Sequence, residues 1–195
     1  MLSIDTNAKT IKGQQYGYMT GVLYLAPYTL SGYNTCAMAH IAECHEPCLN
    51  SAGRGAFNSV QQARIRKTKM FYEDRDAFFA ALIPDITRLI RKARKLGLIP
   101  VCRLNGTSDI KWENVDFWYE GIHYLNIFEM FPDLQFYDYT KMANRNVDHI
   151  PNYDLTFSYS GVPAFQRHTQ KAIDKGYRIA AVSYTHLTLP TKRIV

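Results

Sequence analysis

The feature that most constrains the fold is an alternation of short apolar segments with longer segments of helical periodicity. Residues 21–26 read GVLYLA and residues 99–104 read IPVCRL, and both have the length and character of buried strands. Between them, Leu82, Ile86 and Leu89 recur at the spacing of one helix face. Strands that alternate with helices predict a parallel sheet covered by helices. The predicted fold class is therefore α/β, with a mainly parallel sheet that forms a truncated or partial (β/α) barrel.

The remaining elements follow from the same patterns. Further strands are predicted over residues 134–139, 154–159 and 177–181. Pro84 is expected to kink or restart the helix in which it lies. Helices are predicted from near Cys36 to Pro47, over residues 58–72 with Asn58 as the N-cap, from a cap at Asp74 or Asp76 to Gly97, and over residues 116–130 and 163–175.

Length and composition indicate one globular domain. A chain of 195 residues can bury a sizeable core. Its apolar fraction of 47% and charged fraction of 21% exclude a disordered chain. No apolar run is long enough to cross a bilayer, and the N-terminal residues lack the apolar stretch of a signal peptide. The expected location is the cytoplasm, with no membrane partner.

The C-terminal residues have a different character. Residues 182–191 read VSYTHLTLPT, which resembles one translated reading frame of an adapter used to prepare sequencing libraries. The alternative is a natural strand ended by Pro190. We therefore expect residues 1–181 to form a single incomplete α/β domain and residues 182–195 to be a non-native tail. Without Lys192 and Arg193 the chain has 21 basic and 17 acidic residues, so its net charge falls from +6 to +4.

Three cysteines, Cys36, Cys44 and Cys48, lie within thirteen residues of one another. In an intracellular protein such clustering favours metal or cluster ligation over disulfides. Three thiolates can hold three corners of a four-iron cluster and leave the fourth iron open to a small molecule. A zinc site is the alternative, with His40 or His45 as the fourth ligand. Two further alternatives are a four-cysteine site that recruits Cys102 and a set of buried cysteines that bind nothing.

Polar side chains follow the predicted strands at the points where the strands end. In parallel sheets these ends meet at one edge, where ligands bind. The sequence therefore predicts one pocket shared by the cysteines and these polar side chains. Taken singly, Asp109 could instead cap a helix and Asp138 could pair with Lys141. The candidate cofactor-binding residues are Arg103, Asn105, Thr107, Asp109, Asp138, Lys141 and Ser158.

Basic residues recur on two of the predicted helices. Such runs are usually a solvated outer face. Nucleic acid is a weaker alternative partner, because no known reading module accompanies the charge. The residues are Arg64, Arg66, Lys67 and Lys69 on one helix, and Arg88, Arg91, Lys92, Arg94 and Lys95 on the next.

Several motifs together resemble the phage gene-product-88 family. They span residues 35–158 and thus most of the chain. The resemblance implies an origin in a phage or prophage, and so a location in the cytoplasm of the host cell. It implies no particular activity. The matching segments are NTC with Cys44 and Cys48, GRGAFNSVQQARIRKT, RLNGTSD, FYDYTK and LTFS.

A looser resemblance is to radical S-adenosylmethionine enzymes. Those enzymes also carry three cysteines after the first strand of a partial α/β barrel. Their usual spacing is C-x3-C-x2-C, whereas this chain has C-x7-C-x3-C. The resemblance implies that Cys36, Cys44 and Cys48 bind a 4Fe-4S cluster whose open iron binds S-adenosylmethionine. It also implies that Arg103 and its neighbours Asn105 and Asp109 contact that cofactor.

The leading hypothesis is thus a phage-type metalloprotein with a three-cysteine site that holds an iron–sulfur cluster. Radical S-adenosylmethionine chemistry on a small-molecule substrate is the enzymatic form of this hypothesis. The alternative is a zinc-stabilised, non-enzymatic module that binds nucleic acid or a host protein.

Overall fold

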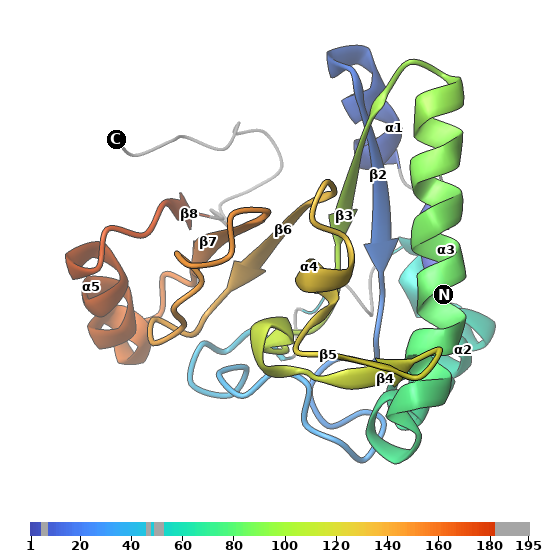
Figure 1. Cartoon of the computed structure of the whole chain (residues 1–195). Helices are drawn as coiled ribbons and strands as arrows, with labels where there is room; N and C mark the ends of the chain where they lie inside the picture. The colour runs from blue at the N-terminus through green and yellow to red at the C-terminus, as the bar shows by residue number, and fades with distance from the viewer. Residues whose placement is uncertain (5–7, 46–47, 49–52, 182–195) are drawn as a thin grey trace.

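A computed structural model describes residues 1–4, 8–45, 48 and 53–181 of the chain. The predicted non-native tail, residues 182–195, lies outside these described residues and stays a prediction. Pro47, at which the first helix was predicted to end, lies outside them too. Figure 1 gives the element labels used below.

The main sheet has six strands in the order β1-β2-β3-β6-β7-β8. Strand β1 pairs with β2 in antiparallel fashion, and every other neighbouring pair is parallel. The predicted α/β class with a mainly parallel sheet is confirmed, while the described strands form no closed barrel. The strands are β1 (Leu2–Ile4), β2 (Tyr18–Leu23), β3 (Ile99–Arg103), β6 (Gln135–Thr140), β7 (Tyr153–Tyr159) and β8 (Ile179–Ala181).

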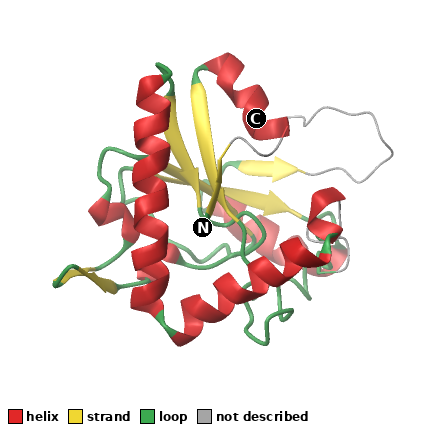
Figure 2. Ribbon diagram, turned by 90° about the vertical axis from the view of Figure 1, so that its right-hand side faces the viewer, coloured by secondary structure: helices red, strands yellow, loops and turns green. Residues whose placement is uncertain are grey.

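Helices cover the sheet, and the longest, α3, runs beside β2 and β3 (Figure 1). Helix α2 meets one end of α3, so that the two long helices form a corner (Figure 2). Asp74 caps α3 by accepting a hydrogen bond from the Ala77 amide at 3.0 Å, as predicted. The helices are α1 (Ala8–Gly13), α2 (Asn58–Glu73), α3 (Arg75–Lys95), α4 (Ile127–Met130) and α5 (Gln166–Asp174).

Two details of the predicted helix ends were wrong. The N-cap of α2 is Phe57, and Asn58 is already the first helical residue. The predicted restart at Pro84 is wrong, because α3 continues through Pro84 with the apolar face that includes Leu82 and Ile86 buried along both halves of the helix. The kink at Pro84 stays a prediction.

The helix predicted from near Cys36 is absent. The described residues from Met38 to Glu43 form a series of turns, with an irregular mixture of backbone hydrogen bonds. Glu43 has a φ of 50°, in the left-handed region, which a continuing helix does not allow. The cysteine segment is therefore a loop.

The helix predicted over residues 116–130 was also wrong. Strands β4 (Phe117–Tyr119) and β5 (Ile122–Tyr124) form an antiparallel hairpin there, and only α4 is helical. Glu120 and Gly121, between the strands, have φ values of 51° and 79°. Positive φ at both central residues is the signature of a type I′ hairpin turn. The aromatic residues of this segment resemble a helix face only in their spacing.

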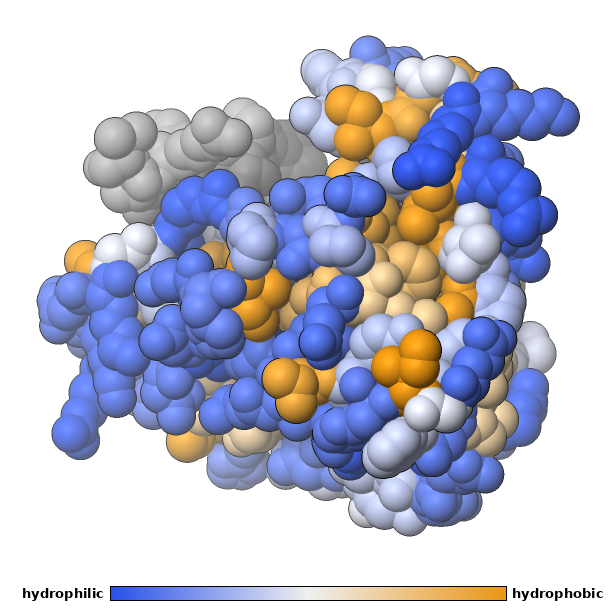
Figure 3. All heavy atoms as spheres, viewed as in Figure 1, coloured by the Kyte–Doolittle hydropathy of each residue, from blue (hydrophilic) through white to orange (hydrophobic). Residues whose placement is uncertain are grey.

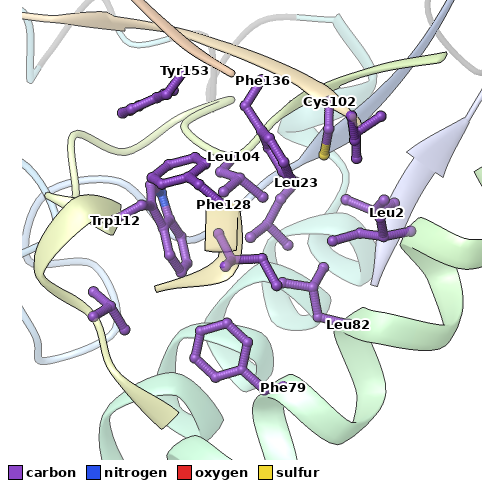
Figure 4. Packing of buried hydrophobic residues seen from close by; sticks show 14 of the residues in the cluster. Leu2, Leu23, Phe79, Leu82, Cys102, Leu104, Trp112, Phe128, Phe136 and Tyr153 are labelled. Carbon is purple, nitrogen blue, oxygen red and sulfur yellow. The ribbon is translucent and has the colours of Figure 1, made fainter. Parts of the chain in front are cut away.

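The core lies between α3 and the sheet. Phe79 and Leu82 of α3 point toward Leu23 of β2, with Trp112 and Phe128 packed alongside (Figure 4). All five side chains are at most 1% exposed. Each such burial is worth about 1.5–3 kcal/mol relative to exposure, so this cluster holds the helix layer against the sheet.

The face seen in Figure 3 is largely hydrophilic, and apolar side chains gather beside α3. Among the described helices, none combines the length and the apolar character needed to cross a membrane.

Candidate functional site

A cavity of about 200 Å³ lies where β2, β3, β6 and β7 end. We call it the strand-end pocket. Because these strands are parallel, the loops that follow them meet at one edge of the sheet. The residues that line it are Pro27, Tyr28, Cys36, Met38, Ala39, Cys44, His45, Cys48, Arg103, Asn105, Gly106, Thr107, Ser108, Asp109, Tyr139, Thr140, Lys141 and Ser158.

All three clustered cysteines line this pocket. None of the four described cysteines is in a disulfide. The Cys36 thiol lies 3.7 Å from the Thr107 carbonyl oxygen, and the Cys44 thiol lies 3.8 Å from the Ala39 carbonyl oxygen. Burial raises the pKa of Cys36 to about 11. It also raises the pKa of Cys44, although the nearby Lys141 ammonium opposes that shift. Both thiols are therefore protonated at neutral pH in this state.

Thr35 fixes the start of the cysteine loop. Its hydroxyl donates to the Ala26 carbonyl at 2.7 Å, and its carbonyl accepts from the Asp109 amide at 2.8 Å. The Cys36 amide donates to the Asn34 side chain at 2.9 Å. These bonds tie Cys36 both to the end of β2 and to the loop after β3.

The ligating side chains share a cavity without forming a finished metal site. Among the described residues, no three His, Cys, Asp or Glu side chains are arranged to hold a metal ion. His45 lines the pocket, whereas His40 does not, and the two rings stack at 5.5 Å. Cys102 is fully buried in the core beside Phe136 and does not line the pocket (Figure 4). Cys102 therefore lies apart from the three cysteines with which the four-cysteine alternative would group it.

Asn105 organises the loop after β3. Its side-chain oxygen accepts from the Ser108 hydroxyl, the Ile110 amide and the Trp112 indole at 2.9–3.1 Å. Its side-chain nitrogen donates to the Ile110 carbonyl at 2.9 Å. Asn105 is 1% exposed, so its side chain shapes the pocket and has little capacity left for a ligand. The Thr107 hydroxyl is engaged too, because it donates to the Leu25 carbonyl.

Gly106 allows this loop to pass close to the end of β2. A Cβ atom at this position would lie 2.6 Å from the Leu23 carbonyl oxygen. Gly106→Ala should therefore lower the free energy of unfolding by about 1–3 kcal/mol in urea titrations. Gly13→Ala is the control, because Gly13 is helical and a Cβ there meets nothing closer than 3.7 Å. Equal stability of the two variants would contradict this steric account.

Asp109 joins the loop after β3 to the end of β6. Its Oδ2 accepts from the Thr140 hydroxyl at 3.1 Å and from the Lys141 amide at 2.8 Å. Its Oδ1 pairs with Arg145 at 3.2 Å. Burial raises the pKa of Asp109, while the Arg145 charge opposes that shift. Asp109 lines the pocket with both oxygens already engaged, and it caps none of the described helices.

Arg145 was not among the residues predicted from the sequence. Its side chain is fully buried and binds Glu113 through Nε at 2.9 Å and Nη2 at 2.5 Å. Nη2 also donates to the Tyr153 hydroxyl at 2.9 Å. Together with the Asp109 contact, these bonds connect three separate segments behind the pocket. An arginine in a loop gives no sequence signal for such a role.

Asp138 lies beneath the pocket and does not line it. One carboxylate oxygen accepts from the Asn105 amide at 2.7 Å, and the other accepts from the Tyr153 hydroxyl at 3.2 Å. Burial raises its pKa to about 7, although Arg103 opposes the shift. Lys141 makes no ion pair with Asp138 among the described contacts. Its ammonium instead donates to the Ser158 carbonyl at 3.0 Å and to the Ser158 hydroxyl at 3.3 Å.

The basic helices are only partly solvated. Arg64 is buried, with its guanidinium 5.0 Å from the centre of the Tyr24 ring. Lys67 donates to the Met1 carbonyl at 3.3 Å, and burial lowers its pKa to about 8. The prediction of a solvated face is wrong for these two residues. It holds for the exposed residues Arg88, Arg91, Lys92, Arg94 and Lys95 of α3.

The aromatic residues of the pocket were not predicted from the sequence either. Tyr28 and Tyr139 both line it. Each belongs to a loop or strand end already expected at this edge of the sheet. Their positions in the chain could therefore have indicated that they line the pocket.

Comparisons with known proteins show the family to which the chain belongs. A search of curated proteins and a search of solved structures each found no match. The family model described as Gene product 88 matches residues 1–193. The match covers nearly the whole chain, so this protein belongs to the Gene product 88 family.

Proposed function

We propose that the strand-end pocket binds an iron–sulfur cluster through Cys36, Cys44 and Cys48. The observation that carries this proposal is that all three cysteines line one cavity, together with polar side chains from three strand ends. Thiolates are the usual ligands of iron–sulfur clusters. The proposal is therefore based on the chemistry of the donors and on their common location.

The number of thiols favours a cluster with an open position. Because Cys102 is buried in the core, three thiols remain for the site. When bound, a 4Fe-4S cluster on three cysteines supplies a low-potential electron and an open iron for a small molecule. Arg103, Lys141 and Ser158 line the same cavity and would contact that molecule. S-adenosylmethionine is the proposed small molecule, and radical chemistry on a further substrate is the proposed activity.

The strand order supports a barrel-like architecture for this site. Strands β2, β3, β6, β7 and β8 are parallel and follow one another across the sheet in chain order. The wall of a (β/α) barrel has this order, and its ligands bind at the carboxyl ends of the strands. We therefore propose that the sheet is the wall of a partial barrel.

Binding of the cluster would need the cysteine loop to close. No three described ligating side chains are poised for a metal as they stand. Metal sites are rarely preformed, and ligand thiols lose their protons when the metal binds. The raised pKa of Cys36 makes that step costly without a metal, and the metal would supply the compensating energy.

Zinc is the second candidate, and it is favoured by the position of His45 in the pocket wall. His45 lines the pocket with the three cysteines, so a Cys3His set is available within one loop. In this case the protein would be a zinc-stabilised, non-enzymatic module. The exposed cations of α3 would then be its contact with nucleic acid or a host protein.

Metal analysis of protein purified without oxygen tests the proposal. We expect brown protein with about four iron and about four sulfide ions per chain. Cys44→Ala should lose the metal, whereas Cys102→Ala should keep it, because Cys102 lies in the core. Colourless protein with one zinc per chain would support the second candidate and contradict the cluster. Protein that takes up no metal after reconstitution would contradict both.

A further inference from the structure

We infer that the strand-end pocket holds a small anionic group, a carboxylate or a phosphate, between Arg103 and Lys141. This inference deepens the proposed function, because it names the chemistry of the molecule that would lie beside the cysteines. It is based on three features of the pocket wall: an arginine whose buried Nε has no hydrogen-bond partner in the described part of the chain, a lysine with two of its three donors engaged, and a carboxylate that already pairs with another arginine.

Arg103 is the first of these features. Its Nε is buried and makes no hydrogen bond to the described part of the chain. The paired carboxylate oxygen, Oδ1 of Asp138, lies 3.9 Å from Nε, which is too far for a hydrogen bond. The guanidinium carbon lies 5.0 Å from the centre of the Tyr139 ring, and the side chain is 25% exposed. A buried donor without a partner is costly, so the site favours a group that supplies acceptors.

Lys141 supplies the second cation. Its ammonium donates to the carbonyl and to the hydroxyl of Ser158, which uses two of its three N–H donors. The same ammonium lies 5.4 Å from the centre of the Phe165 ring. These contacts hold the charge in place at the pocket wall and leave one donor for a ligand.

The negative charge on the pocket wall does not balance these cations. Asp109 is the only carboxylate among the described lining residues, and it pairs with Arg145 behind the wall. Its oxygens also accept from the Thr140 hydroxyl and the Lys141 amide. Beneath the wall, the Asp138 carboxylate lies 3.9 Å from Nε of Arg103 and offsets part of the Arg103 charge, whereas Lys141 has no ion pair among the described contacts. The pocket therefore keeps an excess of positive charge, which favours an anion in a cavity partly shielded from water.

The geometry of a guanidinium fits both proposed groups. Arginine presents paired N–H donors in a rigid fork that matches the two oxygens of a carboxylate or of a phosphate. A carboxylate and a phosphate would both fit this fork. The experiment therefore uses a separate probe for each of the two groups.

Binding of inorganic phosphate and of acetate to the protein as purified tests the inference. Line broadening of the ³¹P signal of phosphate and of the ¹H signal of acetate reports weak binding, and the metal content is measured on the same samples. We expect at least one probe to bind the wild type and Arg103→Gln to bind it about tenfold more weakly or worse. Arg167→Gln is the matched control, because it removes the same charge from an exposed position on α5 that does not line the pocket.

Second variants keep the test decisive if Arg103→Gln does not fold. Arg103→Lys keeps the charge and loses the fork, and Lys141→Gln removes the other cation, so each should weaken binding severalfold. Binding of phosphate alone would identify the anionic group as a phosphate, and binding of acetate alone would identify it as a carboxylate. Either result supports the inference. No binding to the wild type, or equal binding to wild type, Arg103 variants and Lys141→Gln, would overturn it. Because metal content is measured independently, loss of anion binding and loss of the cluster are distinguishable.

Discussion

Arg145→Met should lower the free energy of unfolding by about 3–5 kcal/mol, because it leaves buried carboxylates without their partner. Arg145 is fully buried and binds Asp109, Glu113 and the Tyr153 hydroxyl. Methionine fills a similar volume and supplies no charge. Urea unfolding at neutral pH, followed by circular dichroism, measures the effect, with the slope of the transition compared between the two proteins.

Arg178→Met is the matched control for this experiment. Arg178 also pairs with a carboxylate, that of Asp154, yet its side chain is 66% exposed. Exposed ion pairs contribute about 0–1 kcal/mol, so the control should lose little stability. A loss of less than about 1 kcal/mol in Arg145→Met would show that the buried network can be dispensed with, contrary to the role proposed for it.

Asp138→Asn should remove a large part of the pH dependence of stability. The pKa of Asp138 is about 7 in the folded protein, because burial disfavours its charged form. An unfolded aspartate has a pKa of about 3.9, so the folded state binds more protons between these two values. Stability should therefore fall as the pH rises through this window. Between about pH 4 and about pH 8, the wild type should lose about 4 kcal/mol relative to the variant.

Asp116→Asn is the control with the opposite sign. Its hydrogen bond with His123 lowers the pKa of Asp116, so its charged form is favoured in the folded protein. The stability contributed by Asp116 is thus present at neutral pH and is lost as the pH falls. Unfolding curves collected at several pH values should therefore show changes of opposite sign: Asp138→Asn removes a loss of stability with rising pH, and Asp116→Asn removes a loss of stability with falling pH. Parallel pH profiles for wild type and Asp138→Asn would show that Asp138 has an ordinary pKa.

The two predictions concern one buried network beneath the strand-end pocket. Tyr153 donates to Asp138 and accepts from Arg145, so it connects the two residues. Asp109 then connects Arg145 to the end of β6. This network holds the strand ends at fixed positions, and the candidate ligands of the pocket depend on that rigidity.

The mainly parallel sheet and the meeting of the cysteines with polar strand-end residues in one pocket were predicted from the sequence, whereas β1 and the β4–β5 hairpin were not. Apolar segments such as residues 99–104 indicated strands that are present within a few residues of the expected bounds. Parallel strands place their carboxyl ends together, so Cys36 and Lys141 were expected in one pocket, which both of them line. The spacing of these residues in the sequence did not determine what each side chain binds in the pocket.

Local patterns failed where backbone conformation decided the structure. The cysteine loop contains apolar residues at helical spacing, yet Glu43 has a positive φ and the segment forms turns. Residues 116–130 are aromatic at similar spacing, yet Glu120 and Gly121 form a hairpin turn. A short segment of this kind suits a helix or a hairpin about equally, and packing against the rest of the chain selects one of them.

The sequence by itself determined the α/β class, the family and the clustering of three thiols at the end of the first long strand. Only the tertiary structure decided which polar residues face the pocket. Asn105 and Asp109 are engaged in internal hydrogen bonds, and Asp138 is buried beneath the wall. Arg103 lines the cavity, and its buried Nε has no hydrogen-bond partner in the described part of the chain. The physical reason is that hydrogen-bond partners come from residues distant in the chain, such as Arg145 and Tyr153, which no local pattern connects.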